Sequence, residues 1–389
     1  MKIAYFSDLF LPYINGISIH LSEISIELAK RGHTIELFVP KVGHTPLNFH
    51  YENINMHFIP SIPTFAHEFR VPLPISLNVI KTMLTIKPDI VHFHTPFLIS
   101  SQGIIMAKIL KKPLFATFHG YFMEAEYLKK NGLDKIKLDS NKTLINLGWM
   151  YNNLFLNRAS IVISPSASTK KDLIMNNVMP PIEVISNGIN LSIIKKNILA
   201  DKLKKYILPA HYFLYTGRIS SEKNIELLIK GFSIFSKKIT HINLVIVGDG
   251  PEHNEIKALI KKYGIEKRVY WLGMINHDTL LNSNIYKDAL AFVTTSKSET
   301  QCICGLEALA FGLPIIGVNA RAIPDIIKTN GVLIEPDNID QLVNAMIYIA
   351  EKTDIRQEMS AASFRLAERH SIDKSADKLE QIYKSISIK

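Results

Sequence analysis

The sequence YFLYTGRISSEKN, at residues 212–224, decides the fold class of this chain. It opens with the apolar and aromatic run Tyr212–Thr216, a composition that is typical of a buried strand. Gly217 follows at a turn, and a helical pattern starts near Asn224. A strand, a turn and a helix in this order form the repeating unit of parallel α/β proteins. The stretch therefore predicts an α/β fold built on a parallel sheet.

The same alternation continues on both sides of this stretch. Towards the C-terminus it predicts helices that start near Glu252, Gly305 and Ile339, and strands at Leu244–Val247, Val269–Leu272, Ala291–Thr295, Pro314–Val318 and Val332–Ile334. Towards the N-terminus it predicts a helix at Ser101–Leu110, a helix that ends at Gly32, and strands at Lys2–Ser7, Thr34–Val39, Asp89–His94, Leu114–Phe118 and Ile161–Pro165. Residues 121–142 are polar and irregular, and we expect a surface excursion there.

Two series of strands indicate two domains. The chain has 389 residues, more than a single hydrophobic core usually serves. Ser192–Pro209 has little apolar pattern, so we place the hinge there, between domains at 1–195 and 205–368. Open parallel sheets bind ligands at the carboxyl ends of their strands. We therefore expect two Rossmann-like domains that face each other across a cleft holding the active site.

The composition is that of a globular protein, with 47% hydrophobic residues. The longest apolar stretch, Ala308–Val318, is too short to span a bilayer, and the N-terminus lacks signal-peptide features. The only cysteines, Cys302 and Cys304, are too close in sequence for an unstrained disulfide, which favours a reducing compartment. We expect a cytoplasmic protein that is able to contact a membrane from that side.

The chain is basic, with a formal net charge of +10. Lysines outnumber acidic residues between positions 108 and 142, where they stand at Lys108, Lys111, Lys112, Lys129, Lys130, Lys135, Lys137 and Lys142. Such a stretch favours an anionic neighbour, either nucleotide phosphates or acidic lipid headgroups. A generally lysine-rich composition explains the excess equally well. We expect no nucleic-acid partner.

The loop Pro12–Gly16 lies between the first predicted strand and helix. Gly16 would let the backbone approach a ligand closely, and exposed amides at a helix start favour anionic or hydroxyl groups. The loop is not a Gly-x-Gly-x-x-Gly motif, which argues against a nicotinamide dinucleotide.

His119 follows the apolar strand Leu114–Phe118, in the segment Thr117–Gly120. A histidine there would point into the crevice, where it could donate a hydrogen bond to a sugar or stabilise charge at the reacting carbon. A structural histidine is the alternative. His92 and His94 share one face of the preceding strand and are interpreted as support for it. A His-x-His pair is also compatible with a bound metal, but the sequence shows no third residue that would complete such a ligand set.

Arg218 and Lys223 frame the turn before the helix that starts near Asn224. Two cations and the helix amides suit a diphosphate, because a leaving nucleoside diphosphate gains negative charge as its bond breaks. The chain contains no Asp-x-Asp motif, so the common divalent-metal clamp is absent and we expect no metal cofactor. A surface ion pair between Arg218 and Glu222 is the alternative.

Glu299 and Glu307 have seven residues between them, one in the loop after strand Ala291–Thr295 and one inside the next helix. A carboxylate accepts hydrogen bonds from two vicinal hydroxyls, so one could hold a donor sugar and the other a ribose. An exposed pair of glutamates is common, and the spacing alone is a modest signal.

Together these features resemble the fourth family of retaining glycosyltransferases, which have the GT-B fold. The resemblance runs from Lys2 to about Glu335 and rests on Asn15-Gly16, His119-Gly120, Asn187-Gly188-Ile189, Gly217-Arg218, Glu222-Lys223-Asn224, Gly248-Asp249-Gly250-Pro251 and the two glutamates. It implies that Arg218 and Lys223 bind the donor diphosphate and that Glu307 binds the ribose. It also implies that Glu299 contacts the donor sugar and that His119 lies beside the reacting carbon.

The resemblance further implies donor contacts at Gly16, Gly250, Thr300, Gln301, Cys302 and Ile303. It implies a last helix, at 369–389, that crosses back to the first domain, and retention without a clearly positioned protein nucleophile. Two positions depart from the family pattern: Cys302 replaces a usual glycine beside the phosphates, and Asn190 replaces a usual aspartate. The Cβ of Cys302 narrows the backbone choices of that loop.

The segments Ser298–Gln301 and His67–Pro74 look like the branch that includes diacylglycerol glucosyltransferases. The resemblance thus implies transfer of a hexose, with glucose from a UDP-sugar favoured, to an acceptor such as a membrane lipid. The alternative is a GDP-mannose-dependent mannosyltransferase that acts on a glycan or a lipid-linked acceptor. A sugar-nucleotide epimerase, a phosphorylase and a non-catalytic nucleotide-sugar-binding protein are further alternatives of the same architecture.

Overall fold

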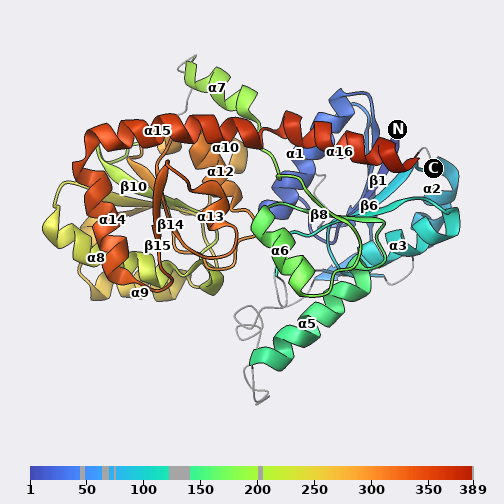
Figure 1. Ribbon diagram of the computed structural model, residues 1–389, viewed down its shortest axis with the longest axis horizontal. Coiled ribbons are helices and arrows are strands. Elements are labelled where there is room, and N and C mark those ends of the chain that lie inside the picture. The colour runs from blue at the N-terminus through green and yellow to red at the C-terminus, as the bar shows by residue number, and fades with distance from the viewer. Residues whose placement is uncertain (44–48, 64–69, 74–75, 122–140, 200–204, 388–389) are drawn as a thin grey trace. The chain divides into compact units, whose positions relative to one another are not determined.

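A computed structural model describes residues 1–43, 49–63, 70–73, 76–121, 141–199 and 205–387. The chain forms two compact units, one of Met1–Gly188 with Ile372–Lys389 and one of Ile189–Ser371. Each unit is a parallel sheet with helices packed on it, so the predicted α/β class with two Rossmann-like domains is confirmed (Figure 1). The units are described separately below.

The first unit has a seven-stranded parallel sheet in the order β3-β2-β1-β6-β7-β8-β9. Its strands are β1 (Lys2–Phe6), β2 (Thr34–Pro40), β3 (Ile54–Ile59), β6 (Ile90–Phe93), β7 (Leu114–Thr117), β8 (Ile161–Ser164) and β9 (Ile182–Val184). A separate antiparallel pair joins β4 (Ser61–Pro63) to β5 (Arg70–Pro72). The order reverses between β1 and β6, and such a switch point creates a ligand crevice at the carboxyl ends of the strands.

Helices cover both faces of this sheet. They are α1 (Gly16–Lys30), α2 (Leu77–Ile86), α3 (Leu98–Leu110), α5 (Asn141–Leu156), α6 (Ala167–Met175) and α16 (Ile372–Ser387). Alternate residues of β1 enter two different cores, Ala4 and Phe6 on one face and Ile3 and Tyr5 on the other. This explains why the strand is apolar from Ile3 to Phe6.

The last helix of the chain belongs to the first unit. Helix α16 buries Ile372, Ala376, Leu379 and Tyr383 in the same core as Leu21 and Leu28 of α1, and Figure 1 shows the two helices side by side. These α16 residues recur at helical spacing, which gives the helix one apolar face. The chain therefore begins and ends in the same unit.

The second unit has a six-stranded parallel sheet in the order β12-β11-β10-β13-β14-β15. Its strands are β10 (Tyr212–Thr216), β11 (Asn243–Val247), β12 (Val269–Trp271), β13 (Ala291–Thr294), β14 (Ile315–Val318) and β15 (Gly331–Ile334). Its α-helices are α7 (Leu191–Leu199), α8 (Ile225–Lys238), α9 (His253–Lys262), α10 (His277–Leu281), α11 (Asn284–Lys287), α12 (Ile303–Ala310), α13 (Ile323–Ile326), α14 (Ile339–Glu351) and α15 (Thr353–Ala367). Residues 212–224 form β10, a turn, the 3₁₀ helix Ser221–Lys223 and the N-cap of α8, Asn224. The switch point lies between β10 and β13.

The boundary between the units differs from the predicted hinge at Ser192–Pro209. Helix α7 lies in that range, and Ile189, Leu191 and Ile194 pack in the core of the second unit. The first unit therefore ends at Gly188 and not at residue 195. Five of the nine residues of α7 are Leu or Ile, so the segment has more apolar character than the predicted hinge allowed.

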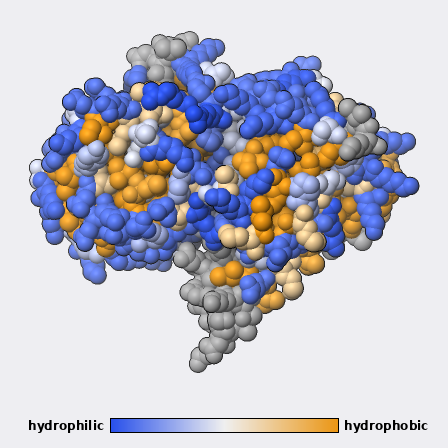
Figure 2. All heavy atoms as spheres, in the orientation of Figure 1, coloured by the Kyte–Doolittle hydropathy of each residue, from blue (hydrophilic) through white to orange (hydrophobic). Residues whose placement is uncertain are grey.

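Hydrophilic side chains cover most of the face drawn in Figure 2, and hydrophobic residues show between them on both units. No helix among the described residues is long and apolar enough to cross a membrane.

Candidate active site

The loops after β10 and β11 are joined backbone to backbone. The amide of Gly217 donates to Val247 O at 3.0 Å, and the amide of Ile219 donates to Asp249 O at 3.0 Å. A Cβ at Gly248 would lie 1.9 Å from Gly217 O, and a Cβ at Gly250 would lie 2.4 Å from Ile219 O. Both glycines are therefore required for this close approach, which fixes the loop that carries Arg218.

Two residues predicted from separate motifs lie together in this unit. Lys223 ends the 3₁₀ turn Ser221–Lys223 before α8, and Glu299 lies in the loop after β13. The Lys223 Nζ is 2.5 Å from Glu299 Oε1, and the two side chains are 25% and 13% exposed. Burial alone would lower the pKa of Lys223, but the Glu299 carboxylate outweighs burial and raises the pKa above its usual value. Lys223 therefore stays cationic at neutral pH.

Glu307 lies inside α12 and is only 2% exposed. Its carboxylate accepts a hydrogen bond from His277 Nε2 at 2.7 Å and another from the Tyr286 hydroxyl at 2.7 Å. The Tyr286 hydroxyl also lies 2.7 Å from Thr216 Oγ1, at the end of β10. Sequence reasoning missed His277 and Tyr286, because both belong to short helices without a recognisable motif.

Thr300, Gln301 and Cys302 are buried in the loop before α12, and Ile303 begins the helix half-buried. Cys302 has a φ of 52°, in the left-handed region that glycine adopts most readily. The sequence analysis expected its Cβ to restrict this backbone, and the loop nevertheless keeps the left-handed conformation. Burial raises the pKa of the Cys302 thiol well above its usual value, so the side chain is a neutral thiol at physiological pH.

In the first unit, Gly16 is exposed and opens α1. Asn15 caps this helix, and its Oδ1 accepts hydrogen bonds from the amides of Ile17 and Ser18, both at 3.0 Å. Two of the amides that we expected to face a ligand are thus already used by Asn15.

His119 follows β7 and is partly buried. Its Nε2 lies 3.0 Å from Nδ1 of His94, which follows β6. His94 stacks on His92, and His92 contacts the Tyr383 hydroxyl of α16 at 2.5 Å and Thr117 Oγ1 at 2.8 Å. The interpretation of His92 and His94 as support therefore agrees with their contacts.

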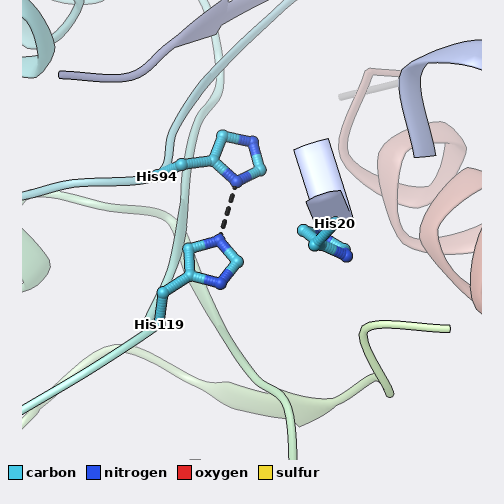
Figure 3. A group of neighbouring side chains, drawn as sticks. All are labelled: His20, His94 and His119. Atoms are coloured by element: carbon cyan, nitrogen blue, oxygen red, sulfur yellow. Dashed lines mark hydrogen bonds between the residues drawn. The ribbon is translucent and has the colours of Figure 1, made fainter. Parts of the chain in front are cut away.

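The His-x-His pair does not act as a unit, because both ring nitrogens of His92 are used by Tyr383 and Thr117, but His94 alone joins a different group of histidines. His20, in the second turn of α1, approaches His94 and His119, and the three side chains face one space (Figure 3). In sequence, the strands β2, β3 and β6 lie between His20 and His94, so the spacing of the histidines could not reveal this contact.

The chain matches two family models, one described as Glycosyltransferase Family 4 at residues 14–193 and one as Glycosyl transferases group 1 at residues 208–365. It is 31% identical over 329 residues to the alpha-monoglucosyldiacylglycerol synthase of Streptococcus pneumoniae, a match that covers 81% of this chain and 70% of that protein. It is 26% identical over 373 residues to the enzyme of the same name from Acholeplasma laidlawii, covering 92% and 91% of the two chains.

Among solved structures, HepE of Anabaena in complex with UDP has a TM-score of 0.74 and 18% identity, over 99% of this chain and 100% of that chain. At this identity the match shows the fold. The two sheets and this likeness show a fold of the GT-B type, and the two family models and the 31% identical relative show that the chain is a glycosyltransferase. The chain belongs to glycosyltransferase family 4, and within it resembles the diacylglycerol glucosyltransferases.

Proposed function

We propose that this enzyme transfers glucose from UDP-glucose to a diacylglycerol-type lipid with retention of the anomeric configuration. The observation that carries the proposal is the pairing of Lys223 with Glu299 in the second unit, where a cation and a carboxylate meet at strand ends. Lys223 and Arg218 would neutralise the diphosphate, and Glu299 would bind hydroxyls of the donor sugar. The two relatives named as monoglucosyldiacylglycerol synthases support the choice of sugar and acceptor.

The remaining roles follow from the same residues. Glu307 would hold the ribose, with His277 and Tyr286 fixing its carboxylate. Gly16, Gly250 and the loop Thr300–Ile303 would line the donor. His119 would lie beside the reacting carbon. Burial lowers the pKa of His119 well below its usual value, so at neutral pH it would act as an uncharged hydrogen-bond donor or acceptor.

We expect transfer to proceed without a divalent metal, because fixed cations take the place of a metal clamp. Full-length protein treated with EDTA should convert UDP-glucose and diacylglycerol vesicles into an α-linked glucosyl lipid and UDP, measured by mass spectrometry and proton NMR. GDP-mannose in parallel reactions tests the alternative donor, and reactions without acceptor detect an epimerase. If EDTA abolishes activity and Mg²⁺ or Mn²⁺ restores it, the metal-free mechanism is wrong. A β-linked product would exclude retention.

We further propose that the enzyme works at the cytoplasmic face of an anionic membrane, bound peripherally through its first unit. Lys108 and Lys111 are exposed at the end of α3, and Lys129, Lys130, Lys135 and Lys137 lie outside the described residues. On α5, Leu147, Met150 and Leu154 are 46%, 59% and 53% exposed. Their spacing places them on one face of the helix, and an exposed apolar helix face suits a bilayer surface. The segment His67–Phe69, part of the branch resemblance, also lies outside the described residues.

Binding to vesicles should therefore rise with the fraction of anionic lipid and fall with salt. Each basic residue near the surface contributes roughly 1 kcal/mol, so replacing Lys129, Lys130, Lys135 and Lys137 by Glu should weaken binding by roughly a thousandfold. Flotation with vesicles of defined composition measures this. Leu147→Ser with Met150→Ser tests the apolar face separately. Donor hydrolysis without acceptor should be unchanged in both variants. Indifference of the wild type to anionic vesicles at low salt would favour a soluble acceptor.

A further inference from the structure

Three histidines of the first unit converge on one space from three elements. His20 comes from α1, His94 follows β6, and His119 follows β7 (Figure 3). One ring nitrogen of each lies within 4.8 Å of the corresponding nitrogen of the other two. The ring centroids of His20 and His119 are 5.1 Å apart, and those of His94 and His119 are 5.3 Å apart. The group contains no carboxylate and no thiol.

His20 is already oriented as metal-binding histidines are. Its Nδ1 lies 2.8 Å from the carbonyl oxygen of Asn187, and a carbonyl only accepts, so Nδ1 carries the proton. Burial lowers the pKa of His20 to about 4, so the ring is neutral at physiological pH and Nε2 offers a lone pair. A backbone carbonyl that fixes the tautomer in this way is the usual outer partner of a histidine ligand.

His94 is 1% exposed, and it directs one ring nitrogen at the cluster: its Nδ1 lies 3.0 Å from His119 Nε2. A cation held between the three rings would therefore bind His94 through Nδ1. The other nitrogen, Nε2, would then carry the ring proton, and it has no hydrogen-bond partner among the described residues. A cavity adjoins the ring, lined by His94, His119, Thr95 and Thr117 among others but not by His20. Two nitrogens that already lie 3.0 Å apart are close to the separation of two nitrogen ligands on one small cation.

We infer that His20, His94 and His119 form a binding site for one divalent cation of intermediate softness, with Zn²⁺ as its representative. Neutral imidazole suits Zn²⁺, Cu²⁺ and Ni²⁺, whereas Mg²⁺ and Ca²⁺ require oxygen ligands. In a tetrahedral site with Zn–N bonds of 2.0–2.1 Å, ligand nitrogens are about 3.3 Å apart. The most distant pair, which lies within 4.8 Å, must therefore approach by at most about 1.5 Å. The proton shared between His94 and His119 moves to the other nitrogen of its own ring.

The consequence for catalysis is inhibition. A bound cation occupies the lone pair of His119, and His119 is then unable to serve a sugar at the reacting carbon. The binding itself is independent of the proposed function. Only the expected inhibition rests on it, so the two are tested by separate measurements.

The test is titration of EDTA-treated and desalted full-length protein with Zn²⁺ by calorimetry, and with Co²⁺ by visible absorption. Wild type should bind one equivalent tightly, and Co²⁺ should give the d–d bands of a low-coordinate nitrogen site. His20→Ala and His94→Ala should each lower the affinity for this one metal ion. The decrease should be at least the 10–100-fold that loss of an outer partner of a ligand typically costs. His50→Ala, an exposed histidine outside the cluster, is the matched control and should bind like wild type.

Variants that fail to fold would be detected by the emission of Trp149, which stacks on Phe118 in the same unit. The conservative variant His94→Gln provides a second reading, because it keeps a polar side chain of similar length. An unchanged tight equivalent in the triple alanine variant, or no tight equivalent in folded wild type, would overturn the inference. Zinc binding by a protein without transferase activity would instead overturn the proposed function alone.

Discussion

Replacement of Lys223 by alanine is expected to lower kcat about 100- to 1,000-fold, the usual scale for one electrostatic contact made in the transition state. As the glycosidic bond breaks, negative charge accumulates on the leaving diphosphate. Lys223 is held cationic by Glu299, so its charge is available to neutralise the leaving group. Arg218→Ala should show a loss of the same order. Steady-state kinetics with the nucleotide sugar measure both.

The ion pair with Glu299 requires a matched control, because removal of Lys223 also leaves a carboxylate without its partner. Glu299→Gln breaks the same pair but keeps the cation. If Lys223 acts only by holding Glu299, the two single variants and the double variant will have the same kinetics and the same melting temperature. If Lys223 acts on the diphosphate, Lys223→Ala will lose kcat beyond any shared effect. If Lys223→Ala and Arg218→Ala raise KM and leave kcat unchanged, the two side chains bind the substrate and the transition state equally well. That result would contradict the assigned role.

Acid is expected to unfold the first unit before the second. Burial lowers the pKa of four histidines in the first unit, namely His20, His92, His94 and His119. When the pKa of a histidine is lower in the folded than in the unfolded state, the unfolded state binds more protons as the pH falls. The contribution to stability is therefore complete above the unfolded value of 6.5 and is lost as the pH falls from there towards the folded value.

His20 alone, with a pKa of about 4, should remove about 2 kcal/mol from the free energy of unfolding between pH 7 and pH 5. The other three act in the same direction. Asp8 opposes them, because burial raises its pKa to about 6 and the folded state then gains protons in this range. Asp8 offsets about 1 kcal/mol at pH 5, which leaves a net loss.

The two tryptophans separate the units in this experiment. Trp149 packs on Phe118 and Tyr121 in the first unit, and Trp271 donates to Gly248 O in the second. Urea unfolding of Trp271→Phe thus reports the first unit, and that of Trp149→Phe reports the second. The midpoint seen by Trp149 should fall steeply from pH 7 to pH 5, and more than that seen by Trp271. Equal shifts of the two urea midpoints would mean that the buried histidines do not determine how stability falls in acid.

The fold was largely predictable because its strands are buried on both faces. In β1 and β10 every residue is apolar or aromatic except Lys2, which begins β1, and Thr216, which ends β10, so the strands stand out from the helices without tertiary information. Elements with weaker patterns were missed, among them β3, α2, α5 and α6. Strand β3 lies at the sheet edge and carries alternating polar residues such as His57, which pairs with Glu36. Its stability comes from that neighbour and not from its own composition.

The candidate site was predictable only where a motif marks it. Lys223 and Glu299 were chosen from separate motifs, and the structure pairs them. The partners of Glu307 were not foreseen, because Tyr286 and His277 reach its carboxylate from short helices that no periodicity marks. His20 was missed for a related reason: its contacts with His94 and His119 join a helix to two strand ends that are distant in sequence. Contacts of this kind arise from packing and have no local signal.

The return of α16 to the first unit has a consequence for synthesis on the ribosome. The first unit lacks its last helix until the whole second unit has been translated, because Ile189–Ser371 intervenes. At 5–20 residues per second, roughly 180 residues take about 10 to 40 s. During that interval Tyr5 and His92 lack the Tyr383 hydroxyl, and the groove that receives α16 is exposed on the nascent chain. We expect chaperones that bind apolar surface to bind the nascent chain during this interval. The interval ends when the finished protein is released from the ribosome.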